Sequence, residues 1–201
     1  MAEKIGVVAG YAALFGQVSL NLADKGEVPC FETINAGGLA LGPNVLLDRH
    51  HLEFLGVVAT TSSGTLRCGF DETGLWFEAD LYPQSAGFDV LNGLRGGRSL
   101  AASFTMIDRR AEREGNLDTV WSATVIGLAL LRPGRAVYSG TRAWLADELP
   151  RDAVAARLQS LRLRAGARLI AAARRAPSNR WPLHAMDWHQ TEQAAQRLGL
   201  L

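Results

Sequence analysis

A strand-like pattern of alternating side chains is the feature that most constrains this chain. From Leu75 to Leu81, leucine, phenylalanine and alanine occupy every second position, while tryptophan and acidic residues lie between them. A two-residue period is typical of a β-strand with one buried face. Thr119 to Leu131 predicts a longer strand, and the polar stretch from Asp108 to Asp118 predicts a loop before it. Residues 1–147 are therefore expected to form a mainly β domain.

Two other stretches have the spacing of helices. Between Gln84 and Arg95 apolar residues recur three positions apart, and Gly96 predicts the end of that helix. After Pro150 apolar side chains again recur at helical spacing as far as Leu169, with arginines on the other face. We therefore expect a helical C-terminal region over residues 148–201, packed on the β domain or on a partner molecule.

The composition argues against several classes of function. Hydrophobic residues make up 48% of the chain, enough for a buried core and too many for a disordered protein. The net charge of +1 gives no sign of a nucleic-acid partner, and no apolar run is long enough to cross a membrane. Cys30 and Cys68 form neither a disulfide framework nor a zinc site. We expect no metal, no cofactor and a cytoplasmic location.

Two histidines and one serine are candidate catalytic residues. His50 and His51 lie where one expected strand ends and the next begins, and Ser103 lies in a mainly apolar strand. A histidine in such a turn can be a solvated surface residue or a general base, since its pKa lies near neutrality. A serine among small residues can bond the backbone or act as a nucleophile. The residues alone leave both alternatives open.

A series of short segments carries further information through its order and spacing. The segments are Gly10–Gly16, Phe31–Gly38, Leu46–His50, Phe54–Val58, Gly74–Ala79, Gly97–Phe104 and Leu128–Ala136. In this order they resemble the prohead (capsid-maturation) proteases of tailed phages, a family related to the herpesvirus protease assemblin. The resemblance spans residues 5–145. It implies an α+β fold that is mainly β: an assemblin-like closed β-barrel surrounded by helices, with the protease domain over residues 1–147.

The resemblance also implies roles for individual residues. His50 takes the position of the general base and Ser103 that of the nucleophile, with His51 as the alternative base or the residue that orients it. The turn before Ala136 resembles a loop that stabilises the oxyanion, which makes Gly134 and Arg135 support candidates. The alternative for Arg135 is a solvated turn arginine.

One position departs from the family pattern. Where the family has a third polar residue, a histidine or an acid, this chain has Gly127. Glycine cannot orient an imidazole or stabilise its cation. The nearest alternatives in the sequence are His51, Asp48 and Glu53, and none occupies the family's position. The enzyme is therefore expected to run as a Ser–His dyad, to borrow another acid, or to be impaired.

The function implied by the resemblance is that of a serine endopeptidase of phage or prophage origin. It would work inside the procapsid, in the host cytoplasm, and cleave the scaffold segment of the capsid protein as well as itself. A homodimer through the C-terminal helix is a further expectation. One alternative is a catalytically impaired capsid-assembly or scaffold-like protein with the same fold. Another is an unrelated β-barrel binding module whose helical tail is an interaction arm.

Overall fold

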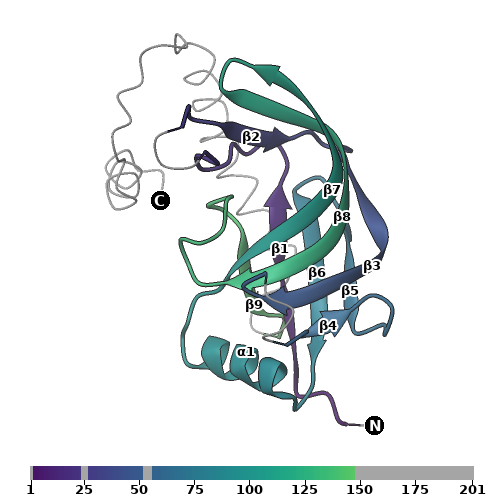
Figure 1. Cartoon of the computed structure of the whole chain (residues 1–201). Coiled ribbons are helices and arrows are strands. Elements are labelled where there is room, and N and C mark those ends of the chain that lie inside the picture. The colour runs from purple at the N-terminus through teal and green to yellow at the C-terminus, as the bar shows by residue number, and fades with distance from the viewer. Residues whose placement is uncertain (1, 24–26, 52–55, 148–201) are drawn as a thin grey trace.

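The computed structural model describes residues 2–23, 27–51 and 56–147, which fold mainly into β-strands (Figure 1). One sheet is antiparallel and has four strands in the order β5-β6-β1-β9. A second, five-stranded sheet is built on β8 and holds β2, β3, β4 and β7. The strands are β1 (Gly6–Leu14), β2 (Phe31–Ile34), β3 (Leu39–Arg49), β4 (Ala59–Thr60), β5 (Leu66–Phe70), β6 (Gly74–Leu81), β7 (Ala101–Glu114), β8 (Leu117–Leu131) and β9 (Arg142–Leu145).

Strand β8 organises the second sheet because both of its edges are paired. β7 runs antiparallel along one edge of β8, from Ala101 opposite Leu131 to Glu114 opposite Leu117. On the other edge, β2 and then β3 pair with β8 in parallel. This arrangement brings the end of β3 to within one strand of the start of β7. The two segments that carry the candidate catalytic residues are therefore neighbours.

The hydrophobic core lies between the two sheets. The alternation in β6 is confirmed: Leu75, Phe77, Ala79 and Leu81 are almost completely buried. From the second sheet, Leu47 of β3 and Leu128 of β8 belong to the same cluster. Burying a side chain of this size contributes roughly 1.5–3 kcal/mol, so this contact between the sheets fixes which face of each strand remains outside.

A closed, assemblin-like barrel surrounded by helices is the wrong fold class for the described residues. The two sheets form separate hydrogen-bonded ladders that meet at isolated points. The Ala143 N–H donates to the Leu100 carbonyl and the Gly16 N–H to the Ile34 carbonyl. β9, which has four residues, pairs along its length with β1 and meets the chain before β7 only at the single bridge between Ala143 and Leu100.

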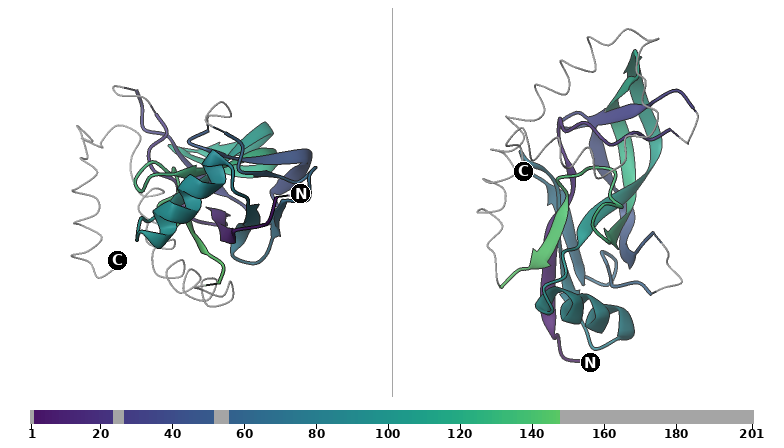
Figure 2. Two further views of the ribbon diagram at one scale, coloured as in Figure 1. Left: turned by 90° about the horizontal axis from the view of Figure 1, so that it is seen from below. Right: turned by 90° about the vertical axis from the view of Figure 1, so that its left-hand side faces the viewer.

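Within the described part of the chain, helices do not surround the sheets either. The one helix in the described ranges is α1 (Ser85–Arg95), which was expected and which lies at the end near the N-terminus (Figure 2). It is too short to cross a membrane, so the described ranges contain no helix that could do so. The expected helical region over 148–201 lies outside the described residues, as does any homodimer contact through it.

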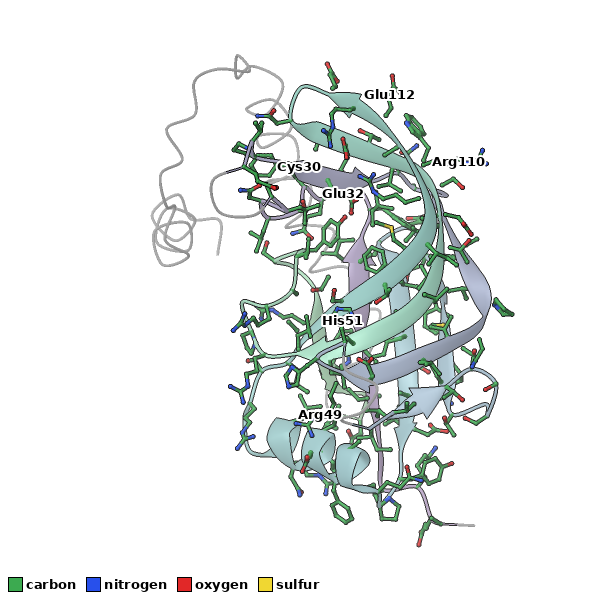
Figure 3. The ribbon with its side chains drawn as sticks, in the orientation of Figure 1. Cys30, Glu32, Arg49, His51, Arg110 and Glu112 are labelled. Carbon is green, nitrogen blue, oxygen red and sulfur yellow. The ribbon has the colours of Figure 1, made fainter. Side chains whose placement is uncertain are left out.

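The expected loop over 108–118 is also wrong, because β7 and β8 continue through it as a long hairpin. Arg109 donates to Glu32 of β2 and to Asp118 of β8, both at 2.7 Å, and Arg113 donates to Asp118 at 2.6 Å. Both carboxylates are almost completely buried. Glu32 is labelled between β2 and the hairpin in Figure 3. These ion pairs allow charged residues to continue the strand.

Candidate active site

Ser103 lies in β7, on the face of the second sheet that points away from the core. It pairs with Ala129 of β8, and on the other edge of β8 the same Ala129 pairs with Asp48 of β3. Residues directly opposite one another point to the same face of a sheet. The neighbours Ala102 and Leu128 belong to the core, so Asp48, Ala129 and Ser103 form a row on the outer face. Ser103 is 7% exposed.

A second row lies two residues further along the same face. Thr105 pairs with Gly127, and Gly127 pairs with Leu46. A Cβ atom at position 127 would lie 3.7 Å from Thr105 Cβ and 3.9 Å from the Leu46 carbonyl oxygen. These are ordinary contact distances, so Gly127 leaves room for a side chain beside Thr105.

The two histidines form a tight turn where β3 ends. Both have a positive φ, 66° for His50 and 57° for His51, a conformation that costs of order 1 kcal/mol for residues other than glycine. The turn is held by its backbone: His50 N–H donates to the Leu130 carbonyl and His51 N–H donates to Asp48 Oδ1, each at 3.1 Å. Strained turns of this kind are often found at functional sites.

The His51 ring lies on the same outer face as Ser103. Its Nδ1 atom is 3.1 Å from Oγ1 of Thr105, and Figure 3 labels it over β7 and β8. Residues i and i+2 of a strand share a face at a spacing of roughly 6.5–7 Å, which is the separation expected between Thr105 and Ser103.

His50 lines a different hollow. It shares a cavity of about 540 Å³ with Asp89, Arg98 and Arg132, among other residues. Burial lowers the pKa of His50, and the positive charges of Arg49 and Arg132 lower it further, while Asp48 opposes them. This environment therefore favours the neutral form of the His50 ring. Ser103 is not among the residues that line this cavity.

The structure thus brings some of the expected residues together. Asp48, Ser103, Gly127 and His51 share one face, whereas His50 occupies the neighbouring cavity. Neither histidine is hydrogen-bonded to Ser103 within the described ranges, so the pairing of Ser103 with His50 stays a prediction. Sequence reasoning missed Thr105. Its signal was the two-residue spacing from Ser103, which places both side chains on one face.

The turn after β8 folds back toward Ser103. Ala136 packs with Ala101, Ala129 and Leu131 in a small apolar cluster on the outer face. Arg135 N–H donates to the Arg132 carbonyl at 3.2 Å, and Gly134 has a φ of 79°. Gly134 and Arg135 are both exposed. The turn therefore comes next to Ala129, the strand partner of Ser103, and it carries an exposed arginine, a kind of group that can stabilise an oxyanion.

The described ranges contain no group of three or more histidine, cysteine or acidic side chains that could hold a metal ion. The described face instead combines the Thr105 hydroxyl and the His51 imidazole with the Ser103 hydroxyl and the Asp48 carboxylate. Such a set can orient a histidine and transfer a proton.

Comparisons with known proteins agree with this chemistry. A family model described as caudovirus prohead serine protease matches residues 1–129 of the 201-residue chain. The matched range contains Ser103, both histidines, Thr105 and Gly127, and it ends before the turn that carries Arg135. Searches of curated proteins and of solved structures each found no match.

Proposed function

Because the chain belongs to the caudovirus prohead serine protease family, we propose that it is a serine endopeptidase of phage or prophage origin that acts inside the procapsid. Its substrates are the scaffold segment of the capsid protein and the chain itself. The observation that supports the activity best is that Ser103 and the His51 ring lie on one outer face. Thr105 shares this face with Ser103 and contacts the His51 ring.

In this mechanism Ser103 is the nucleophile. A serine hydroxyl attacks poorly until a base removes its proton. As Ser103 Oγ bonds to the carbonyl carbon of the scissile peptide, its proton passes to the imidazole. The imidazolium then gives that proton to the leaving amine. Water then attacks the carbonyl carbon of the acyl-enzyme as the imidazole takes its proton, and the imidazolium gives that proton to Ser103 Oγ as the ester bond breaks, which restores the free serine.

We assign the base to His51, with His50 as the alternative. The contact between His51 Nδ1 and Thr105 Oγ1 supports this assignment because it places the ring on the face that carries Ser103. The family spacing supports His50, one residue away. The two histidines share a turn and a backbone conformation, so each is the matched control for the other.

We assign the stabilisation of the oxyanion to the turn after β8. The proximity of Ala136 to Ala129 supports this assignment because it brings the turn next to the serine row. The Gly134 amide and the Arg135 guanidinium are the proposed donors. Each donor of this kind typically contributes a factor of roughly 10²–10³ to the rate.

A fluorophosphonate probe tests the nucleophile and the base together. We expect the full-length protein to be labelled at Ser103, and Ser103→Ala to abolish the label. Labelling of Ser99→Ala, a matched control at a serine that lines the His50 cavity, should be unchanged. His51→Ala should slow labelling about 100-fold, with His50→Ala close to the unsubstituted protein. Labelling independent of Ser103 contradicts the proposal, whereas a larger loss in His50→Ala moves the base to His50.

The substrate is tested by co-expression with a capsid protein that carries its scaffold segment. Cleavage of that segment should depend on Ser103. A capsid protein that remains intact while the fluorophosphonate label forms would contradict the substrate and leave the peptidase activity standing.

A second candidate function is that of a catalytically impaired capsid-assembly protein with the same fold. Gly127 favours it, because no acid or histidine stands at the usual third position. This candidate predicts no fluorophosphonate labelling at any pH and association with the capsid protein without cleavage. The labelling experiment therefore separates the two functions.

A further inference from the structure

The empty position at Gly127 faces a hydroxyl group. Gly127 pairs directly with Thr105 across β8 and β7, and a Cβ atom at Gly127 would lie 3.8 Å from Thr105 Oγ1. A polar side chain from position 127 would therefore reach the region that the threonine hydroxyl already occupies. The polar side chain that the family has at this position and the hydroxyl of Thr105 would therefore occupy the same space.

The Thr105 hydroxyl contacts Nδ1 of His51. This ring nitrogen must keep its proton if Nε2 is to act as the base. Thr105 Oγ1 lies 3.1 Å from His51 Nδ1. If the hydroxyl accepts the Nδ1 proton, the lone pair is on Nε2, which can then take the proton of a serine. If the hydroxyl instead donates to Nδ1, the proton is on Nε2 and the ring cannot act as a base. The productive tautomer is therefore the one in which threonine is the acceptor.

His51 is held at a second point as well. Its backbone N–H donates to Asp48 Oδ1 at 3.1 Å, and Asp48 shares the cross-strand row of Ser103. The backbone contact fixes the turn and the ring contact fixes the direction of the imidazole. Between them they anchor the histidine to the two rows that also carry the nucleophile and Gly127.

We propose that Thr105 is the positioning residue for His51 and that its hydroxyl replaces the third polar group that Gly127 cannot supply. The proposal rests on the assignment of His51 as the base. During the reaction Nε2 gains the serine proton and loses it to the leaving amine, while the Nδ1 proton remains donated to Thr105. Because the hydroxyl is neutral, it orients the ring without the charge stabilisation that a carboxylate gives the imidazolium.

Removal and restoration of the hydroxyl test this role. Thr105→Val keeps the shape of the side chain, and we expect it to lower kcat roughly 10- to 100-fold with KM unchanged, part of what general-base catalysis contributes. Thr105→Ser should recover most of that loss. Thr124→Val, a matched change on β8, should leave kcat unchanged. Full activity in Thr105→Val, or Thr105→Ser as slow as Thr105→Val, overturns the proposal.

A readout without catalysis separates this inference from the proposed function. Nitrogen-15 NMR of the His51 ring should show the Nδ1–H tautomer in the unsubstituted protein and a mixture of tautomers in Thr105→Val. The shift should be absent in Thr124→Val. If the protein shows this tautomer pattern but no peptidase activity, the proposed function is refuted and the contact between Thr105 and His51 stands. Equal tautomer populations in the three proteins refute the contact, whatever the activity.

Discussion

Ser103 and Asp48 flank the same residue, Ala129, from opposite edges of β8. Asp48 uses its Oδ1 to accept the backbone N–H of His51, so the row that carries Ser103 also supports the turn that carries His51. A parallel β3–β8 pair beside an antiparallel β7–β8 pair produces this arrangement. The geometry of the site therefore depends on the register of three strands.

The Asp48 contact gives a prediction for activity. Asp48→Ala removes the acceptor for His51 N–H and should lower the labelling rate of Ser103 about tenfold, because a loosened turn no longer holds the ring over Thr105. Asp48→Asn retains an oxygen acceptor and should lose less. Labelling rates with a fluorophosphonate, at matched folded fraction by circular dichroism, check this. Equal losses in the two variants would mean that the carboxylate acts by its charge.

The His50 cavity gives a prediction for stability. The pKa of His50 lies below its ordinary value of 6.5, because of burial and of Arg49 and Arg132, against Asp48. Asp89 and Arg98 also line the cavity. The unfolded chain therefore binds more protons than the folded one as the pH falls through this region, and stability decreases.

His50→Gln should remove that pH dependence. Its free energy of unfolding should fall less than that of the unsubstituted protein between pH 7.5 and 5, measured by urea titration at each pH. His51→Gln is the matched control and should retain the slope. Identical slopes in all three proteins would show that His50 titrates normally in the folded state.

Local patterns were enough to predict β6 and α1. The alternation from Leu75 to Leu81 and the stop at Gly96 depend on neighbours within a few residues, and both are present in the structure. The β7–β8 hairpin was missed because its charges are compensated from far away. Arg109 pairs with Glu32, which is 77 positions earlier in the chain, and no local pattern contains that partner.

Local patterns likewise predicted one part of the candidate site and missed another. Ser103 and the turn of His50 and His51 were singled out from the sequence, and their catalytic roles stay predictions, whereas the shared face of Ser103 and Thr105 follows from strand periodicity. The direction of the His51 ring does not follow from any local pattern, because it is set by a contact with Thr105, 54 positions later in the sequence. The division into two sheets likewise depends on which strands pair across long stretches of sequence, which side-chain patterns do not fix.

The ion pairs of the hairpin predict sensitivity to acid. Hydrogen bonds from Arg113 and Arg109 lower the pKa of Asp118 to about 2, against the opposing effect of burial. Stability from this group is therefore present above about pH 4, the ordinary range of an aspartate, and is lost as the pH falls toward 2.

Asp118→Asn should lower the free energy of unfolding at pH 7 by roughly 2–3 kcal/mol, because it leaves Arg113 without its charged partner and Arg109 with Glu32 alone. It should also flatten the acid dependence between pH 4 and 2. Chemical denaturation at several pH values measures both effects. Asp71→Asn, in a turn of the other sheet, controls for the loss of any one carboxylate. An unchanged acid slope in Asp118→Asn would contradict the assignment.

The position of Gly127 gives the last prediction. A histidine there should fit, since a Cβ atom meets Thr105 Cβ at 3.7 Å and the Leu46 carbonyl oxygen at 3.9 Å. Gly127→His should raise the labelling rate of Ser103 only a few fold when Thr105 is present, because the His51 ring is already oriented. In the Thr105→Val background, Gly127→His should raise the labelling rate of Ser103 about 10- to 100-fold, which is the part of general-base catalysis that the lost hydroxyl supplied. Residues that act on one group are non-additive in this manner. Gly127→Ala, which fills the space without a polar atom, should rescue neither background. An equal gain from Gly127→His in both backgrounds would show that Thr105 and the new imidazole act independently, and His51 would then lack an orienting partner in the natural chain.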